Sequence, residues 1–192
     1  MRRPVALAAL VLWLGLSSSG PAVGASLALT DHEKEEALRV GQRSITTEVF
    51  GAEWRIVGGA GESVTVITPF HRLALAGRHA AFKNEPLKAQ EQQRMLDELK
   101  ERLMFEVNLV GPRPEFARYL APRLLAGDRE IEPALVQNER TALRQEGGAY
   151  LARCRYWFSS KELIAGSQLV LVVRDPEGQQ VARFPIDLAR MR

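Results

Sequence analysis

The feature that most constrains the fold of this chain is a change in hydrophobic period near residue 104. Across residues 87–103 the apolar side chains recur at intervals of three and four, whereas across 104–109 every second residue is apolar. Side chains return to one face every 3.6 residues on a helix and every 2 residues on a strand. The sequence therefore predicts an α+β protein in which helices precede strands.

The region before this change is expected to hold three helices. Thr30 and Glu33 have the spacing of a capping box, so a first helix is predicted from there to about Arg43. Thr68 followed by Pro69 is typical of a helix start, and Asn84-Glu85-Pro86 of a helix end. The two further helices are predicted over residues 70–83 and 87–103.

A β-hairpin is expected between the first two helices. Residues 53–57 and 64–68 are rich in β-branched and aromatic side chains, and Gly58-Gly59-Ala60-Gly61 connects them. A phosphate-binding loop needs its glycines to lead from a strand into the amino end of a helix, and here a second strand follows. This glycine cluster therefore indicates a turn.

The region after residue 104 is expected to be an immunoglobulin-like antiparallel β-sandwich, because seven or eight short strands separated by turn signals are typical of that class. The clearest strands are predicted at 104–109, 149–158, 169–173 and 184–188, and weaker ones at 123–125, 130–133, 135–137 and 141–144. The sequence thus predicts a signal peptide over 1–25, a helical region with a hairpin over 26–103 and a sandwich domain over 104–192.

The amino-terminal segment has the features of a cleavable secretory signal peptide. Arg2 and Arg3 precede an apolar run, 5–16, which is shorter than the ~20 residues that a membrane span needs. Small residues end the segment, so cleavage is predicted after Ala25. An uncleaved anchor is the alternative. The protein is expected in the periplasm or outside the cell, with no transmembrane span in its mature chain.

The charge balance of the mature chain argues against nucleic acid as a partner. Removing Arg2 and Arg3 from the 26 basic residues leaves 24, against 23 acidic residues, so the net charge is about +1. The single cysteine, Cys154, has no second thiol for an internal disulfide. It alternates with polar residues on a predicted strand, which indicates a buried thiol; a reactive or intermolecular thiol is the alternative.

Residues for a catalytic, cofactor or metal site are not found together in the sequence. His71 and His79 lie on one predicted helix, but eight residues place them ~12 Å apart along its axis, too far to share an ion. No nucleophile motif surrounds a serine or the cysteine. The sequence therefore predicts no cofactor and no metal.

The predicted helix at 70–82 has two different sides. One side carries mostly small residues, which would let another element approach closely. The other side mixes cations with large apolar groups, as surfaces that contact acidic partners do, and is the predicted partner-binding surface. Its members are His71, Arg72, Leu75, Arg78, His79 and Phe82. The alternative is that Leu75 and Phe82 pack beneath the neighbouring helix and the arginines only reach solvent.

These observations predict an exported, non-catalytic accessory or binding protein that recognises a protein or an anionic envelope component. An exposed sheet edge that pairs with an extended segment is one way to do so. Two alternatives stay open at this stage. One is a hydrolase of envelope polymers with a cleft between the two halves, and the other is a structural or oligomer-forming secreted protein.

Overall fold

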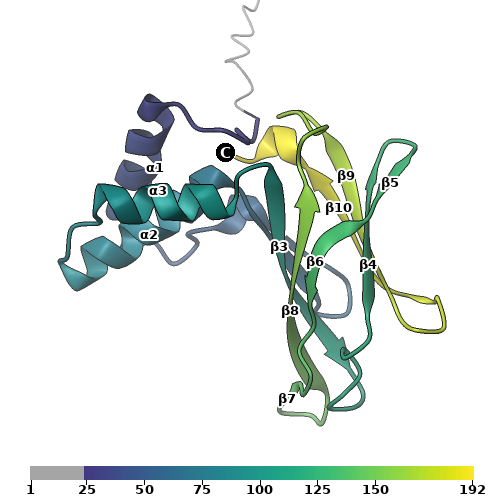
Figure 1. The fold of residues 1–192 in the computed structure, drawn as a ribbon. Coiled ribbons are helices and arrows are strands. Elements are labelled where there is room, and N and C mark those ends of the chain that lie inside the picture. The colour runs from purple at the N-terminus through teal and green to yellow at the C-terminus, as the bar shows by residue number, and fades with distance from the viewer. Residues whose placement is uncertain (1–23) are drawn as a thin grey trace, which may run out of the picture.

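A computed structural model describes residues 24–192, and in that range it contains three α-helices and two antiparallel sheets (Figure 1). The helices are α1 (Asp31–Arg43), α2 (Pro69–Lys83) and α3 (Ala89–Glu98). The strands are β1 (Arg55–Val57), β2 (Ser63–Ile67), β3 (Arg102–Gly111), β4 (Ala121–Ala126), β5 (Arg129–Ile131), β6 (Pro133–Gln137), β7 (Leu143–Arg144), β8 (Tyr150–Ser159), β9 (Gln168–Arg174) and β10 (Gln180–Asp187). The predicted α+β class is confirmed.

The strands form two sheets that share one hydrophobic core. The first has the order β1-β2-β3-β8-β6, with β7 also paired to β8, and the second has the order β10-β9-β4-β5. The longest ladder joins β3 to β8, from Arg102 opposite Ser159 to Gly111 opposite Tyr150. The helices lie together beside one end of the first sheet (Figure 1).

The alternation in the sequence determines which side chains enter this core. On β8 the buried residues are Ala152, Cys154, Tyr156 and Phe158, and the residues between them face outward. Cys154 is a free, buried thiol, as the alternation predicted, and burial raises its pKa. The apolar run on β9 is buried almost throughout, which is typical of a strand covered on both faces.

Two glycines let α1 and α2 approach closely. A Cβ atom at Gly41 would lie 2.0 Å from the carbonyl oxygen of Ala74, and one at Gly77 would lie 3.0 Å from that of Leu38. The small-residue side of α2 therefore packs against a neighbouring helix, as its composition predicted. A larger side chain at Gly41 would force the two helices apart.

The third helix is shorter than predicted. It ends at Glu98, and Glu101 has φ +55°, so the chain turns and enters β3 at Arg102. Leu99 and Leu103 are both buried, but Leu103 belongs to the inward face of a strand. A spacing of four residues fits a helix face and a strand face equally well, which is why the pattern extended the predicted helix too far.

The predicted hairpin forms, and it joins the first sheet. Residues 52–54 form a 3-10 turn, β1 and β2 follow, and β2 pairs with β3 from Ser63 opposite Asn108 to Ile67 opposite Met104. The boundary expected at residue 103 therefore falls within β3, which pairs with β2 of the hairpin.

The Trp54 junction, which consists of Glu53, Trp54, Thr68, His71 and Arg192, connects this hairpin to the end of the chain. The carbonyl oxygen of Arg192 accepts hydrogen bonds from Trp54 Nε1 at 2.8 Å and from Thr68 Oγ1 at 2.6 Å. The Arg192 guanidinium pairs with Glu53 at 2.8 Å. Residues more than a hundred positions apart are thus held together by partly buried polar contacts.

His71 is buried in this junction. Its ring is stacked on the Trp54 ring with centroids 4.3 Å apart, and its Nδ1 lies 3.1 Å from the carbonyl oxygen of Val66. Burial lowers the pKa of His71 to about 4, and the charge of Arg72 acts in the same direction. His71 is therefore neutral at neutral pH.

The predicted signal peptide lies outside the described residues, except for Gly24 and Ala25. Ala25 is buried, and its amide nitrogen donates to the carbonyl oxygen of Leu188 at 2.8 Å. A cut after Ala25 would remove this residue from the core. Within residues 24–192 no helix is both long enough and apolar enough to cross a bilayer.

Candidate functional site

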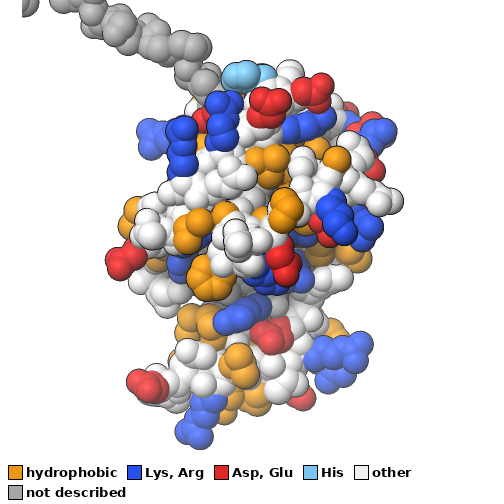
Figure 2. Space-filling model, turned by 90° about the vertical axis from the view of Figure 1, so that its left-hand side faces the viewer, with side chains coloured by type: hydrophobic (Ala, Val, Ile, Leu, Met, Phe, Trp, Pro, Cys, Tyr) orange, Lys and Arg blue, Asp and Glu red, His pale blue; other side chains and the backbone are white. Residues whose placement is uncertain are grey.

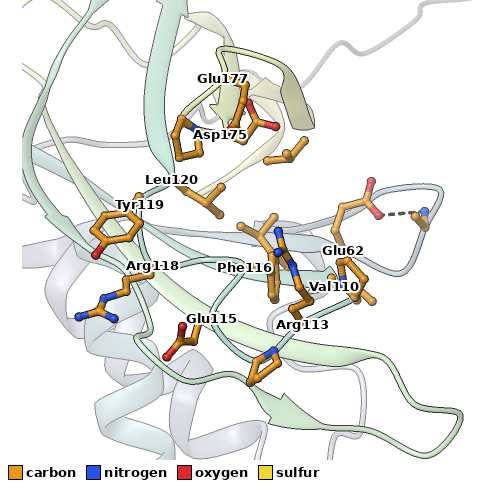
Figure 3. A pocket seen from close by; sticks show the side chains of 17 residues that line it. Glu62, Val110, Arg113, Glu115, Phe116, Arg118, Tyr119, Leu120, Asp175 and Glu177 are labelled. Atoms are coloured by element: carbon orange, nitrogen blue, oxygen red, sulfur yellow. Dashed lines mark hydrogen bonds between the residues drawn. The ribbon is translucent and has the colours of Figure 1, made fainter.

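The loop-end cleft is a concavity of about 640 Å³ at the ends of β3 and β9 that lie away from the helices. Three connections surround it: the β1–β2 turn (58–62), the β3–β4 loop (112–120) and the β9–β10 turn (175–179). Figure 3 shows the side chains that these connections direct around it. Segments far apart in the sequence thus build one cavity.

The floor of the cleft is apolar. Leu109 and Leu120 are buried there, whereas Val110 and Val181 are exposed at its sides. Gly111 lets the β3–β4 loop fold back over the end of β3, because a Cβ atom at this position would lie 2.4 Å from Cγ of Phe116. This contact places the Phe116 ring in the cleft wall.

Charged side chains of both signs line the rim. Arg118 and Tyr119 lie on one side, Glu62 on the opposite side, and Asp175 and Glu177 along a third (Figure 3). Among residues 24–192, none of these charged groups forms an ion pair within 4.0 Å, nor does Arg113 or Glu115. Their charges are therefore available to a ligand.

Some of these rim groups are positioned by the loops themselves. Glu62 accepts a hydrogen bond from the amide of Ala60 at 2.8 Å, and Asp175 accepts one from the amide of Gln179 at 2.7 Å. The Arg118 guanidinium lies 5.4 Å from the centre of the Tyr119 ring, and Tyr119 is 68% exposed. The guanidinium and the exposed ring thus present a positive charge and an aromatic face side by side at the surface.

The cleft has the size and the kind of lining that ligand pockets have. Its volume falls within the roughly 300–1,000 Å³ of ligand pockets, and an apolar floor with a few polar groups is typical of them. The side chains with large pKa shifts, His71 and Tyr156, lie outside it. In the part of the chain that the structure describes, no three His, Cys, Asp or Glu side chains are grouped to hold a metal ion.

The structure places the α2 residues that were predicted to form one partner-binding surface in different environments. His71 is buried in the Trp54 junction and is not part of the surface. Arg78 donates to the carbonyl oxygen of Thr47 at 3.1 Å and lies 4.8 Å from the centre of the Phe50 ring. Arg72 lies 3.6 Å from Glu98 of α3. Both arginines of the predicted surface thus have partners within the chain, and His71 is buried.

Three of the predicted residues line a groove of about 510 Å³ between α2 and α3. They are Arg72, Leu75 and His79, and Met95 and Leu87 face them. Phe82 is 79% exposed, so it does not pack beneath the neighbouring helix. Charged side chains of both signs are mixed over this helical face (Figure 2). The partner-binding role of these α2 residues stays a prediction.

The residues of the loop-end cleft were not identified from the sequence. The one available signal was the segment Gly111-Pro112-Arg113-Pro114, followed by Phe116 and Tyr119, which has neither helical nor strand periodicity. Two prolines stiffen a loop, and aromatic residues on a stiff loop often contact partners. Nothing in that segment indicates which other loops it meets.

Comparisons with known proteins do not identify a family. No protein-family model and no curated protein sequence matches this chain. One solved structure, described as a novel protein of unknown function from Burkholderia pseudomallei, is similar over 84% of this chain and 91% of its own. The identity is 11% and the TM-score is 0.43, a similarity too low to support a conclusion about function.

Proposed function

We propose that this protein is an exported, non-catalytic binding protein whose loop-end cleft holds an apolar side chain of a partner protein in the cell envelope. The sequence at 1–25 supports export. The open cleft supports binding.

We also propose an immunoglobulin-like arrangement for the two sheets, supported by their antiparallel strands and shared core. In that class the strand directions of the two sheets lie within about 30°, which a crystal structure would test.

The observation that carries the proposal is the exposure of apolar side chains inside a concave surface. Val110 and Val181 are exposed at the sides of the cleft, beside the buried Leu109 and Leu120. Burial of apolar surface contributes about 25 cal/mol per Å², so a partner side chain that fills the cleft gains binding free energy from both walls. The unpaired charges at the rim then select the partner and its orientation.

Photo-cross-linking in intact cells tests the cleft directly. A photoreactive amino acid replaces Val110 or Val181 in the full chain, and replaces Ile164 in the control, because Ile164 is apolar and 73% exposed but lies outside the cleft. We expect one discrete cross-linked envelope protein from both cleft positions and none from position 164. The absence of an adduct from the cleft positions, or the same adduct from all three, would contradict the proposal.

Export is tested by cell fractionation and by mass spectrometry of the mature amino terminus. We expect the protein outside the cytoplasm, without Met1. A terminus at Ser26 would match the predicted cut but would lose the buried Ala25 and its bond to Leu188. A terminus upstream of Gly24 would keep both. Recovery of the intact chain in the cytosol would contradict export.

A further inference from the structure

A second hollow, the arginine hollow, lies beside the loop-end cleft and shares two residues with it. It measures about 530 Å³, and it is lined by Arg118, Tyr119, Val136, Gln137, Asn138 and Arg140. We infer that this hollow and the adjoining edge of β6 bind an extended, acidic segment of the partner protein as an added β-strand. The inference rests on the proposed function and names the chemistry of the partner.

The first observation is the position of β6 in the sheet. It is the last strand in the order β1-β2-β3-β8-β6, and it pairs with β8 on one side. The ladder is shifted between Pro133 and Leu135 and is regular from Leu135 to Gln137. The backbone groups on the other side of a terminal strand point away from the sheet, where an extended peptide can bond to them.

The second observation is that β6 exposes apolar side chains to both faces. Leu135 is opposite Trp157 and Val136 is opposite Tyr156, so the two side chains point to different faces of the sheet. Both are exposed. Val136 is on the face of the buried Tyr156, and it lines the hollow. A strand added here would therefore contact an apolar side chain on each face, besides the backbone.

The third observation is charge. Two arginines and no acidic side chain line the hollow, and neither Arg118 nor Arg140 forms an ion pair within the described part of the chain. Arg118 is held over the Tyr119 ring, so little rotamer freedom is lost when it binds. Arginine forms paired, charge-assisted hydrogen bonds with carboxylates, which makes an acidic segment the complementary ligand.

The floor of the hollow is held in place by Asn138. Its side-chain nitrogen donates to the carbonyl oxygen of Leu120 at 2.8 Å, and its side-chain oxygen accepts from the Tyr156 hydroxyl at 3.0 Å. These bonds connect the end of β6 to the β3–β4 loop. The edge strand and the loop that carries Arg118 are thus held in a preformed arrangement, which lowers the cost of binding.

A second copy of this chain is a poor fit to the same edge. Pairing β6 with β6 would bring two copies of the Arg118 and Arg140 pair to one interface, and like charges there oppose association. A small anion would satisfy the arginines but would leave the strand edge unused. The acidic, extended segment is the ligand that uses both features.

Synthetic peptides test the inference with fluorescence anisotropy on the mature protein. The probe is an amidated peptide of alternating Val and Glu with a fluorophore attached to its amino terminus, and the control peptides carry the same two ends. One control peptide alternates Val and Lys. A second control keeps the Glu residues but carries backbone N-methyl groups at two successive central positions, so neither of its edges can donate all of its strand hydrogen bonds there.

We expect the acidic peptide to bind and both control peptides to bind at least about tenfold more weakly, and added salt to weaken the acidic peptide further. The double variant Arg118→Gln/Arg140→Gln should lose at least about tenfold in affinity. Arg183→Gln on β10 is the matched control, because Arg183 is also exposed but lies outside the hollow, and it should bind as the unchanged protein does.

Equal binding of the Val–Lys peptide would overturn the acidic ligand. Equal binding of the N-methylated peptide would overturn the added strand, and unchanged affinity of the double variant would overturn the arginine hollow. If the peptides fail but the cross-link at Val110 persists in the double variant, this inference falls and the proposed function stands. If the unchanged protein gives no cross-link at all, the proposed function itself fails.

Discussion

The two ends of the first sheet use the same kinds of side chain for different purposes. At the Trp54 junction the Arg192 guanidinium lies 5.2 Å from the centre of the Phe70 ring and pairs with Glu53, and the aromatic rings there are buried. At the loop end Arg118 lies over a ring in a similar way, but Tyr119 is exposed and the arginine has no ion pair in the described chain.

This difference shows that the environment, more than the residue type, separates a stabilising contact from a binding surface. An arginine stacked on a buried ring beside a carboxylate contributes to the free energy of folding. An arginine stacked on an exposed ring contributes little to folding and stays available to a ligand.

Removing an aromatic ring should affect the two ends very differently. Trp54→Ala deletes a fully buried side chain and its hydrogen bond to Arg192, and we expect a loss of about 3–5 kcal/mol in the free energy of unfolding. Tyr119→Ala should cost less than about 0.5 kcal/mol because the ring is exposed. Urea unfolding measures both. A similar cost for the two variants would contradict the comparison.

Lowering the pH should reduce the free energy of unfolding through protonation of His71 in the Trp54 junction. Its pKa is about 4 in the folded protein and about 6.5 when unfolded, so between these values the unfolded chain binds the proton more strongly. The contribution of neutral His71 is complete above pH ~6.5 and is lost as the pH falls toward 4, by about 3 kcal/mol in total. Urea unfolding across this pH range measures the loss.

A matched pair of histidine variants isolates this effect. His71→Asn removes the titrating ring, so its stability should change less over the same pH range than that of the unchanged protein. His79→Asn replaces an exposed histidine on the same helix and should leave the pH profile as it was. A profile that responds to His79→Asn and not to His71→Asn would disprove this account.

A larger side chain at Gly111 should alter the shape of the loop-end cleft and lower the free energy of unfolding by a moderate amount. Gly111→Ala places a Cβ atom against the Phe116 ring, and we expect a cost of about 1–3 kcal/mol together with weaker cross-linking at Val110. Gly166→Ala is the control, since a Cβ atom there meets nothing within 4 Å. Unchanged cross-linking in Gly111→Ala would show that the Phe116 position does not shape the site.

The smallest expected effect is that of the ion pair at the junction. Glu53→Gln removes the charge that Arg192 contacts, but both side chains are partly exposed, so the loss should be no more than about 1 kcal/mol and should shrink in high salt. Arg190→Ala removes a pair with Asp187 in which the arginine is 85% exposed, and it should have no measurable effect. Urea unfolding of both variants at low and at high salt measures the two effects.

The sequence alone determined the local structure of this protein. The capping box at Thr30, the Thr68-Pro69 helix start and the alternation along β8 each depend on neighbouring residues, and the structure contains each of them. The α+β class and the burial of Cys154 follow from the same local patterns. Where one pattern fits two structures, as at Leu99 and Leu103, local reasoning placed the end of α3 wrongly.

The tertiary structure decided which residues meet. The periodicity of α2 placed His71 beside Arg72 and His79, but the burial of His71 depends on Trp54, and that of Trp54 on Arg192, 138 residues away. The loop-end cleft likewise combines 58–62, 112–120 and 175–179. Local preferences involve only a few successive residues, whereas these contacts depend on strand pairing between distant segments, which no local pattern encodes.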